Sequence, residues 1–276
     1  MNERRFHAEP GWAARIRAAG LDRFDAWWTL PLTEVEPGNR RRGGWSTVFR
    51  YVLDGDCGLF VKRQEDHVYR SWRHPLRGRL TAEREFRVLQ HCRAAGLAVT
   101  EPVLYATLDA DGHRRGVLVT RELAGYRALE DLLADWQRHG WPDRACRERL
   151  LRAVATLVRT LHDAHLEHNC LYPKHVMIRT GWLADGQTGA SPPVVLIDLE
   201  KCKWRWRRMT CALRDLDTLN RRSGDWSRTD RRRFLGWYLG EGTRLSRRGR
   251  RLWRRLGHAA HSVPHAQSAA AASSTA

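Results

Sequence analysis

The feature that most constrains the fold is a polar loop followed by two short apolar runs, within residues 168–198. The loop carries two histidines and a lysine and leads into the apolar residues 176–178. After a polar interruption, a second apolar run over residues 194–197 ends abruptly on Asp198. Short apolar runs bounded by polar residues are typical of buried strands. The pattern predicts a functional loop, two strands and a carboxylate held at the rim of a core.

The charge of the chain indicates an anionic partner. The net charge is +18, from 49 basic and 31 acidic residues, and the isoelectric point is near 10.8. Such a field attracts nucleic acid, anionic lipid headgroups or phosphorylated glycans, and its sign alone does not choose among them. Almost all of the basic residues are arginine, so the few lysines stand out: Lys62, Lys174, Lys201 and Lys203.

Length and cysteine usage exclude several classes of protein. A chain of 276 residues is long enough for one large domain or two lobes. We expect a cytoplasmic protein, because the N-terminus lacks the apolar core of a signal peptide and no apolar stretch is long enough for a membrane helix. Six scattered cysteines without a Cys-x-x-Cys pair do not support a zinc knuckle or a thioredoxin-like motif.

The first half of the chain is β-rich. We expect residues 1–29 to form a helical extension. A turn at Gly43 and Gly44 then opens into two strands, the second of which carries Lys62. Taken alone, this turn fits an ordinary surface hairpin better than a phosphate-covering loop. An amphipathic helix over residues 81–95 has Glu83 and Glu85 in its first turns, and two further strands end near residue 124.

The second half is predicted to be mainly helical. Helices over residues 129–136 and 147–165 lead into the polar loop, and three shorter helices follow Asp198. Residues 201–208 alternate tryptophan with basic residues, which suits a membrane interface or a stacked, phosphate-rich partner, and equally a solvated loop. From residue 258 to residue 276 the chain is rich in Ala, Ser and His, and we expect a disordered tail there.

Taken in order, a glycine turn, a strand lysine, a helix glutamate, a long helix, a His-led loop and a strand-end aspartate are the parts of the protein-kinase-like fold. The sequence resembles the lipopolysaccharide kinase family, which comprises InaA-type proteins and the core heptose and Kdo kinases, over about residues 40–256. The signature is residues 168–178, then 196–199, then 214–216. The resemblance implies an α+β bilobal fold with a β-rich N-lobe over residues 30–124 and a helical C-lobe over 125–257.

The resemblance also implies roles for single residues. Gly43 and Gly44 correspond to the loop over the phosphates of ATP, and Lys62 to the lysine that holds the α- and β-phosphates. Glu85 corresponds to the helix glutamate that pairs with this lysine, and its position suits that role better than the position of Glu83. Asp198 corresponds to the aspartate that holds Mg²⁺. The rarity of lysine in this chain supports the role of Lys62 independently.

The loop departs from the kinase pattern at two positions. Where most kinases have an aspartate and, five residues later, an asparagine, this chain has Cys170 and His175. By resemblance His175 is a metal ligand, and Asp215 braces the loop. A thiol is a poor proton acceptor, so Cys170 is either a weak replacement for the base or a small buried residue without a chemical role. Three side chains could accept the proton in its place: Glu167, Asp163 and His168. Lys174 would stabilise the charge of the γ-phosphate, or it is simply a surface residue.

These observations leave three functions open. The first is an ATP- and Mg²⁺-dependent kinase that phosphorylates a heptose or Kdo hydroxyl of the lipopolysaccharide core, a lipid-linked glycan, in peripheral contact with the anionic inner membrane. The second is a catalytically weak pseudokinase or scaffold, suggested by Cys170. The third, a nucleic-acid binder, is least supported, because no nucleic-acid motif with defined spacing is present. Small-molecule phosphotransfer is also compatible with the fold, which does not fix the acceptor.

Overall fold

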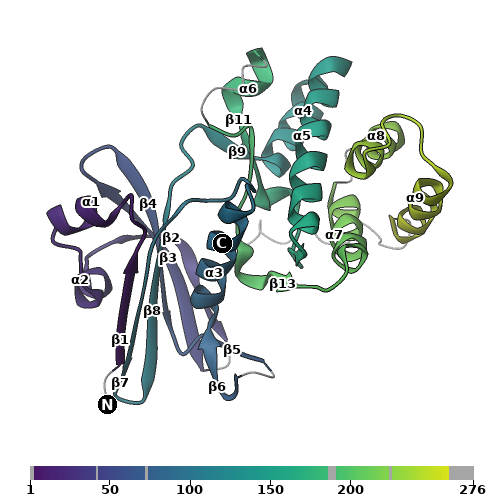
Figure 1. Ribbon diagram of the computed structural model, residues 1–276. Coiled ribbons are helices and arrows are strands. Elements are labelled where there is room, and N and C mark those ends of the chain that lie inside the picture. The colour runs from purple at the N-terminus through teal and green to yellow at the C-terminus, as the bar shows by residue number, and fades with distance from the viewer. Residues whose placement is uncertain (1–2, 42, 72–73, 186–190, 224–225, 261–276) are drawn as a thin grey trace, which may run out of the picture.

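A computed structural model describes residues 3–41, 43–71, 74–185, 191–223 and 226–260. A β-rich lobe and a helical lobe stand side by side, with the chain crossing between them after β8 (Figure 1). The α+β class and the two lobes are as expected from the sequence.

The β-rich lobe is built on a six-stranded antiparallel sheet with the strand order β1-β7-β8-β4-β3-β2. Strand β4 lies inside the sheet, where Lys62 is opposite Val48 of β3 and Leu118 of β8. Alternate residues of β4, including Leu59 and Val61, are fully buried, so the side chain of Lys62 projects from the opposite face of the sheet. The strands are β1 (Glu3–Ala8), β2 (Thr33–Arg41), β3 (Gly44–Leu53), β4 (Cys57–Glu65), β7 (Pro102–Ala110) and β8 (His113–Arg121).

The expectation of a wholly helical extension over residues 1–29 is wrong. Residues 3–8 form β1, which pairs antiparallel with β7 at the edge of the sheet. Short helices α1 (Ala13–Ala18) and α2 (Phe24–Thr29) follow and cover one face of the sheet, where Trp12 and Trp27 are buried (Figure 1). The charged sequence of β1 has little of the apolar alternation that marks a strand. It forms a strand because an edge strand is stabilised by backbone pairing with its neighbour.

Helix α3 (Thr81–Ala94) lies on the other face of the sheet, between the two lobes (Figure 1). Phe86 packs on Tyr105 and Leu118 of the sheet, whereas Leu89 and Cys92 belong to the core of the helical lobe. The helix begins directly after a small hairpin of β5 (Val68–Ser71) and β6 (His74–Leu80). By contacting both cores, α3 holds its acidic residues at the junction of the lobes.

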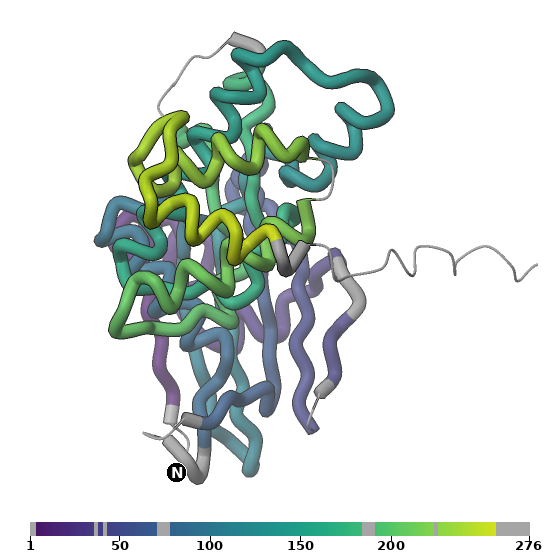
Figure 2. The backbone as a smooth tube through the Cα atoms, turned by 90° about the vertical axis from the view of Figure 1, so that its right-hand side faces the viewer, coloured from purple at the N-terminus to yellow at the C-terminus, as the bar shows by residue number. Residues whose placement is uncertain are grey.

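The helical lobe forms around α5 (Arg144–Asp163), whose apolar face is buried from Leu150 to Leu161. Asp143 caps this helix by accepting a hydrogen bond from the backbone N–H of Cys146. Figure 2 shows α7, α8 and α9 on the side of this lobe that faces away from the sheet. The remaining helices are α4 (Leu129–His139), α6 (Thr180–Asp185), α7 (Arg208–Arg222), α8 (Arg228–Leu239) and α9 (Arg247–Ala260). Within the described ranges, none of the helices has the length and apolar character needed to cross a membrane.

The two apolar runs predicted to flank the polar interruption are strands β11 (Val176–Arg179) and β12 (Val194–Leu196), which pair antiparallel. Strand β9 (Tyr126–Ala128) lies on the other side of β11. The insertion between β11 and β12 begins as a helix, α6, because Trp182 is buried in the core of the lobe. Residues 258–260, expected in a disordered tail, end α9, and residues 261–276 lie outside the described residues.

Candidate active site

Lys62 meets two carboxylates from different parts of the chain. Its Nζ lies 2.6 Å from Glu85 Oε2 of α3 and 3.3 Å from Glu200 Oε2, and these three side chains are 17%, 9% and 16% exposed. Glu200 belongs to a short 3₁₀ turn, η2 (Leu199–Lys201). The expected Lys62–Glu85 pair is therefore present, whereas Glu83 points to Arg79, 2.9 Å away.

The surroundings of Lys62 keep its ammonium charged. Burial by itself lowers the pKa of Lys62, but the negative charges of Glu85, Glu200 and Asp198 outweigh this effect and raise the pKa above its usual value. Burial, together with repulsion from Glu200 and Asp198, raises the pKa of Glu85. The cluster combines three acidic side chains with one ammonium, and its surplus of negative charge favours a further cation.

Asp198 follows β12 and has a left-handed backbone conformation, with φ at +57°. This conformation costs a residue other than glycine some free energy, although aspartate tolerates it better than most, and it recurs at functional sites. The preceding residue is fixed by a hydrogen bond from the N–H of Ile197 to the carbonyl of His175, at 3.0 Å. Burial raises the pKa of Asp198, but nearby positive charge, that of Lys62 above all, outweighs burial and lowers the pKa, so the carboxylate is ionised.

His175 bridges the polar loop and Asp198. Its Nδ1 lies 2.8 Å from the carbonyl oxygen of Cys170 and must donate, because a carbonyl only accepts. Its Nε2 lies 3.2 Å from Asp198 Oδ2. An imidazole nitrogen and a carboxylate oxygen thus converge, and both are ligands for divalent cations.

A protein-only metal cage is absent from the described part of the chain, where no group of three or more His, Cys, Asp or Glu side chains is arranged to hold an ion. Mg²⁺ is commonly held by one or two carboxylates together with the phosphates of a substrate. The surplus negative charge around Lys62 and the ionised Asp198 therefore fit a metal that enters with a nucleotide.

Asp215 of α7 holds the polar loop from the interior of the helical lobe. Its side chain is fully buried. Its carboxylate accepts hydrogen bonds from the backbone N–H of His168 at 2.6 Å and of Asn169 at 2.9 Å, and from His162 Nε2 at 3.2 Å. Asn169 has a left-handed backbone, with φ at +65°. The position of Asp215 agrees with the bracing role that the resemblance implied.

His168 points into the interior rather than to solvent. Its side chain is fully buried, and its Nε2 donates to the carbonyl of Ile197 at 3.1 Å. The ring also stacks on His175, with the centroids 5.7 Å apart. Burial lowers the pKa of His168, so the ring is neutral. This setting favours a bracing role over acceptance of a substrate proton.

The other loop candidates differ in accessibility. Cys170 is only 8% exposed, whereas Lys174 is exposed on the 3₁₀ turn η1 (Pro173–His175). Glu167 is buried on β10 (Leu166–Glu167) and pairs with Arg205 and Arg214. Asp163 pairs with two arginines at the end of α5: Arg159 and Arg208. Both carboxylates considered as substitutes for the base are thus already held in ion pairs.

Gly43 and Gly44 form the turn between β2 and β3. Gly43 has φ at +83°, a conformation that glycine adopts without strain. A side chain at Gly44 would meet the backbone of Asp66 at 2.4 Å and of His67 at 2.6 Å. This close backbone approach explains why position 44 requires glycine. The turn lies at one end of β3, the strand in which Val48 is opposite Lys62.

Glu200 is the site residue that sequence reasoning missed. The left-handed turn at Asp198 reverses the chain and brings Glu200 back to Lys62. The available signal was an acid two residues after the strand-end aspartate, in a stretch that is otherwise basic.

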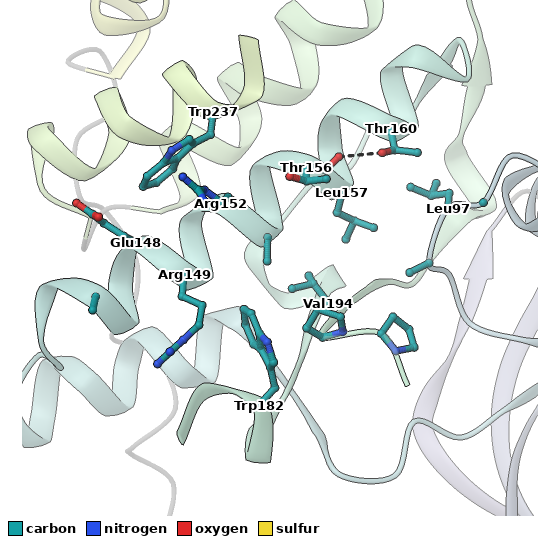
Figure 3. A pocket seen from close by; sticks show the side chains of 16 residues that line it. Leu97, Glu148, Arg149, Arg152, Thr156, Leu157, Thr160, Trp182, Val194 and Trp237 are labelled. Carbon is teal, nitrogen blue, oxygen red and sulfur yellow. Dashed lines mark hydrogen bonds between the residues drawn. The ribbon is translucent and has the colours of Figure 1, made fainter. Parts of the chain in front are cut away.

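A separate cavity of about 700 Å³ lies away from this cluster, among α5, α6, α8 and residues 96–98 (Figure 3). Trp182 and Trp237 form parts of its wall, and the guanidinium of Arg152 lies 5.6 Å from the ring centroid of Trp237. Since neither Lys62 nor Asp198 lines it, the cavity is not part of the site described above.

Comparison with known proteins identifies the family. The model of the lipopolysaccharide kinase (Kdo/WaaP) family matches residues 25–238. Protein InaA of Escherichia coli K12 is 32% identical over 191 residues, which cover 69% of this chain and 83% of InaA. The lipopolysaccharide core heptose(I) kinase WaaP of Pseudomonas aeruginosa is 30% identical over 207 residues, 70% of this chain and 73% of that protein.

A solved structure of WaaP in complex with acyl carrier protein matches with a TM-score of 0.69 at 24% identity, over 93% of this chain and 98% of that chain. This likeness confirms the predicted protein-kinase-like fold. The matched segment of the family model contains Lys62, Glu85, the polar loop and Asp198. The predicted enzyme class, a kinase, is thereby confirmed as well, and the chain belongs to the lipopolysaccharide kinase (Kdo/WaaP) family.

Proposed function

We propose that the protein is an ATP- and Mg²⁺-dependent kinase that phosphorylates a sugar hydroxyl, on heptose or Kdo, of the lipopolysaccharide core at the cytoplasmic face of the inner membrane. The observation that carries the proposal is the convergence of the Lys62–Glu85 pair with Asp198 and His175, in a member of this family. The names of the WaaP relatives support heptose as the acceptor sugar.

The nucleotide side of the site follows from charge and position. Lys62, fixed by Glu85, binds the phosphates of the nucleotide, and Asp198 and His175 hold the metal. When bound, ATP supplies the transferable phosphoryl group and Mg²⁺ neutralises its charge. Glu200 adds negative charge beside the metal position. The turn at Gly43 and Gly44 covers the phosphates from the β-rich lobe.

The acceptor side lies at the polar loop. Lys174 is exposed there, two residues after Tyr172, and stabilises charge on the transferred group. Asp215 and His168 keep the loop in place from the interior. Phosphoryl transfer depends mainly on positioning and charge stabilisation, so the hydroxyl can lose its proton to solvent late in the reaction without a carboxylate at Cys170.

A matched pair of substitutions on α3 tests the assignment. Glu85→Gln removes the partner that orients Lys62 and should reduce transfer from ATP to purified lipopolysaccharide core at least a hundredfold. Glu83→Gln alters the same helix at a residue whose carboxylate pairs with Arg79 and not with Lys62, and should leave transfer unchanged. Equal rates for the two variants would refute the role of Glu85.

A second candidate, a pseudokinase or scaffold, rests on the buried Cys170 at the position of the usual base and on the ion pairs that occupy both Glu167 and Asp163. Replacement of the thiol by a carboxylate separates the two. If the loop is merely disabled, Cys170→Asp creates activity where the wild type has none. If the wild type is active and Cys170→Asp lowers that activity, the pseudokinase candidate is excluded.

A further inference from the structure

The segment between η2 and α7 carries exposed aromatic surface. Trp206 is 99% exposed and Trp204 is 50% exposed, the two highest values among the large hydrophobic residues that the structure describes. Full exposure of an indole to water is unfavourable. Surface tryptophans are common in proteins that bind a membrane interface, where the ring leaves the water. We call residues 203–207 the tryptophan tip.

The base of the tip is held firmly. Its strand β13 (Lys203–Trp204) pairs antiparallel with β10, so that Trp204 is opposite Leu166. The backbone N–H of Arg205 donates to the carbonyl of His165 at 2.9 Å, and His165 Nδ1 donates back to the carbonyl of Arg205 at 3.1 Å. The Arg205 side chain also pairs with the buried Glu167. Trp206 therefore projects from a fixed base and not from a loose loop.

The charged side chains of the segment that carries Trp206 are all positive. Residues 201–210 contain no acid. Lys201, Lys203 and Arg207 are exposed and, among the residues that the structure describes, none of the three is in an ion pair, whereas Arg205 is held by Glu167. An exposed indole between free cations complements an anionic lipid surface, because the indole enters the headgroup region while each nearby Lys or Arg attracts lipid phosphates.

The tip is also coupled to the polar loop. Glu167, which holds Arg205, directly precedes His168 in the chain. Arg214 of α7 donates to both Glu167 and Asn169, at 3.3 Å in each case. A surface bound to the tryptophan tip would therefore lie next to the polar loop. A lipid-linked acceptor would approach the loop from that surface.

We propose that the tryptophan tip docks the protein on an anionic phospholipid bilayer, with Trp206 in the headgroup region and Lys203 and Arg207 on the lipid phosphates. The proposal rests on the proposed function in that it takes the acceptor to be membrane-borne. A single-stranded nucleic acid stacks its bases along a basic groove. Trp206 instead projects freely, since 99% of its surface is exposed and no groove wall covers the indole.

Vesicle binding tests the proposal without ATP or an acceptor. We expect wild type to sediment with phosphatidylcholine vesicles that contain phosphatidylglycerol, and weakly with phosphatidylcholine alone. Trp206→Ala should weaken binding by about tenfold through loss of buried apolar area. The double variant Lys203→Gln/Arg207→Gln should weaken it by about twenty-fivefold on the anionic vesicles, from about fivefold for each cation. All three substituted residues are exposed, so the variants should retain the fold.

Matched controls separate docking from general effects. Trp141→Ala removes another partly exposed indole. Arg17→Gln/Arg23→Gln makes the same charge change in α1 and at the start of α2, helices that lie on the sheet face away from the helical lobe (Figure 1). Both controls should bind vesicles as wild type does. Equal binding by all variants overturns the proposal. So does a tip substitution that weakens binding of a single-stranded oligonucleotide but not of vesicles.

The same variants keep this proposal distinct from the proposed function. Trp206→Ala should phosphorylate a delipidated core oligosaccharide at the wild-type rate and lose activity only on lipopolysaccharide in anionic vesicles. Vesicle binding through the tip with no phosphorylation of either acceptor would leave docking intact and refute the kinase function. Activity on vesicle-bound lipopolysaccharide that is unaffected by Trp206→Ala would refute docking alone.

Discussion

Replacement of Asp215 by alanine should destabilise the fold by about 4 kcal/mol, because one buried carboxylate accepts hydrogen bonds from three donors. The donors are the backbone N–H groups of His168 and Asn169, at 2.6 and 2.9 Å, and His162 Nε2, at 3.2 Å. A hydrogen bond to a charged group contributes about 1.5–3 kcal/mol, and neighbouring contributions do not add fully. For a chain of this length the loss corresponds to a melting temperature lower by about 10 °C.

Thermal unfolding followed by circular dichroism measures this loss. Asp217→Ala is the matched control, because Asp217 lies two residues away on α7 and its pair with Arg221, at 3.0 Å, is partly exposed. Such a pair is worth about 0.5 kcal/mol. If Asp215→Ala melts within about 2 °C of Asp217→Ala, the bracing argument is wrong.

Three further predictions concern the charges of the site. Glu200→Gln removes one of the carboxylates around Lys62 and should raise the Mg²⁺ concentration for half-maximal transfer by about tenfold, or about 1.4 kcal/mol; an unchanged metal titration would refute this. His175→Asn replaces an imidazole nitrogen by an amide oxygen and should raise the ratio of the Mg²⁺-supported to the Mn²⁺-supported rate; an unchanged ratio contradicts metal contact. Burial lowers the pKa of His168 in the fold, so the unfolded chain binds this proton first and stability falls as the pH drops below about 6.5. Urea unfolding at several pH values should show a smaller fall for His168→Gln, and an equal fall would contradict the assignment.

The order of elements was predictable because each element has a local sequence pattern that indicates it. Apolar periodicity marked α3 and α5, and the two short runs marked β11 and β12. The rarity of lysine singled out Lys62, and the position of Glu85 on its helix selected it over Glu83. These signals lie within a few residues of the feature that they predict.

What was not predictable depends on long-range pairing and on single backbone angles. β1 is a strand because it pairs with the edge of β7, and the paired residues are at least 96 positions apart in the chain. Glu200 reaches Lys62 only because Asp198 adopts a left-handed conformation. The burial of His168 likewise follows from tertiary packing, since its sequence context is that of an exposed polar loop.

The most direct test of the account is Mg²⁺-dependent transfer of the γ-phosphoryl group of ATP to lipopolysaccharide core, by wild type and by Asp198→Ala. We predict transfer by the wild type that depends on Mg²⁺ and falls at least a thousandfold in Asp198→Ala, because the ionised carboxylate beside Lys62 and His175 is lost. Equal transfer by the two proteins, or no transfer by the wild type with any divalent metal, would contradict the assignment of this cluster as the active site of a kinase.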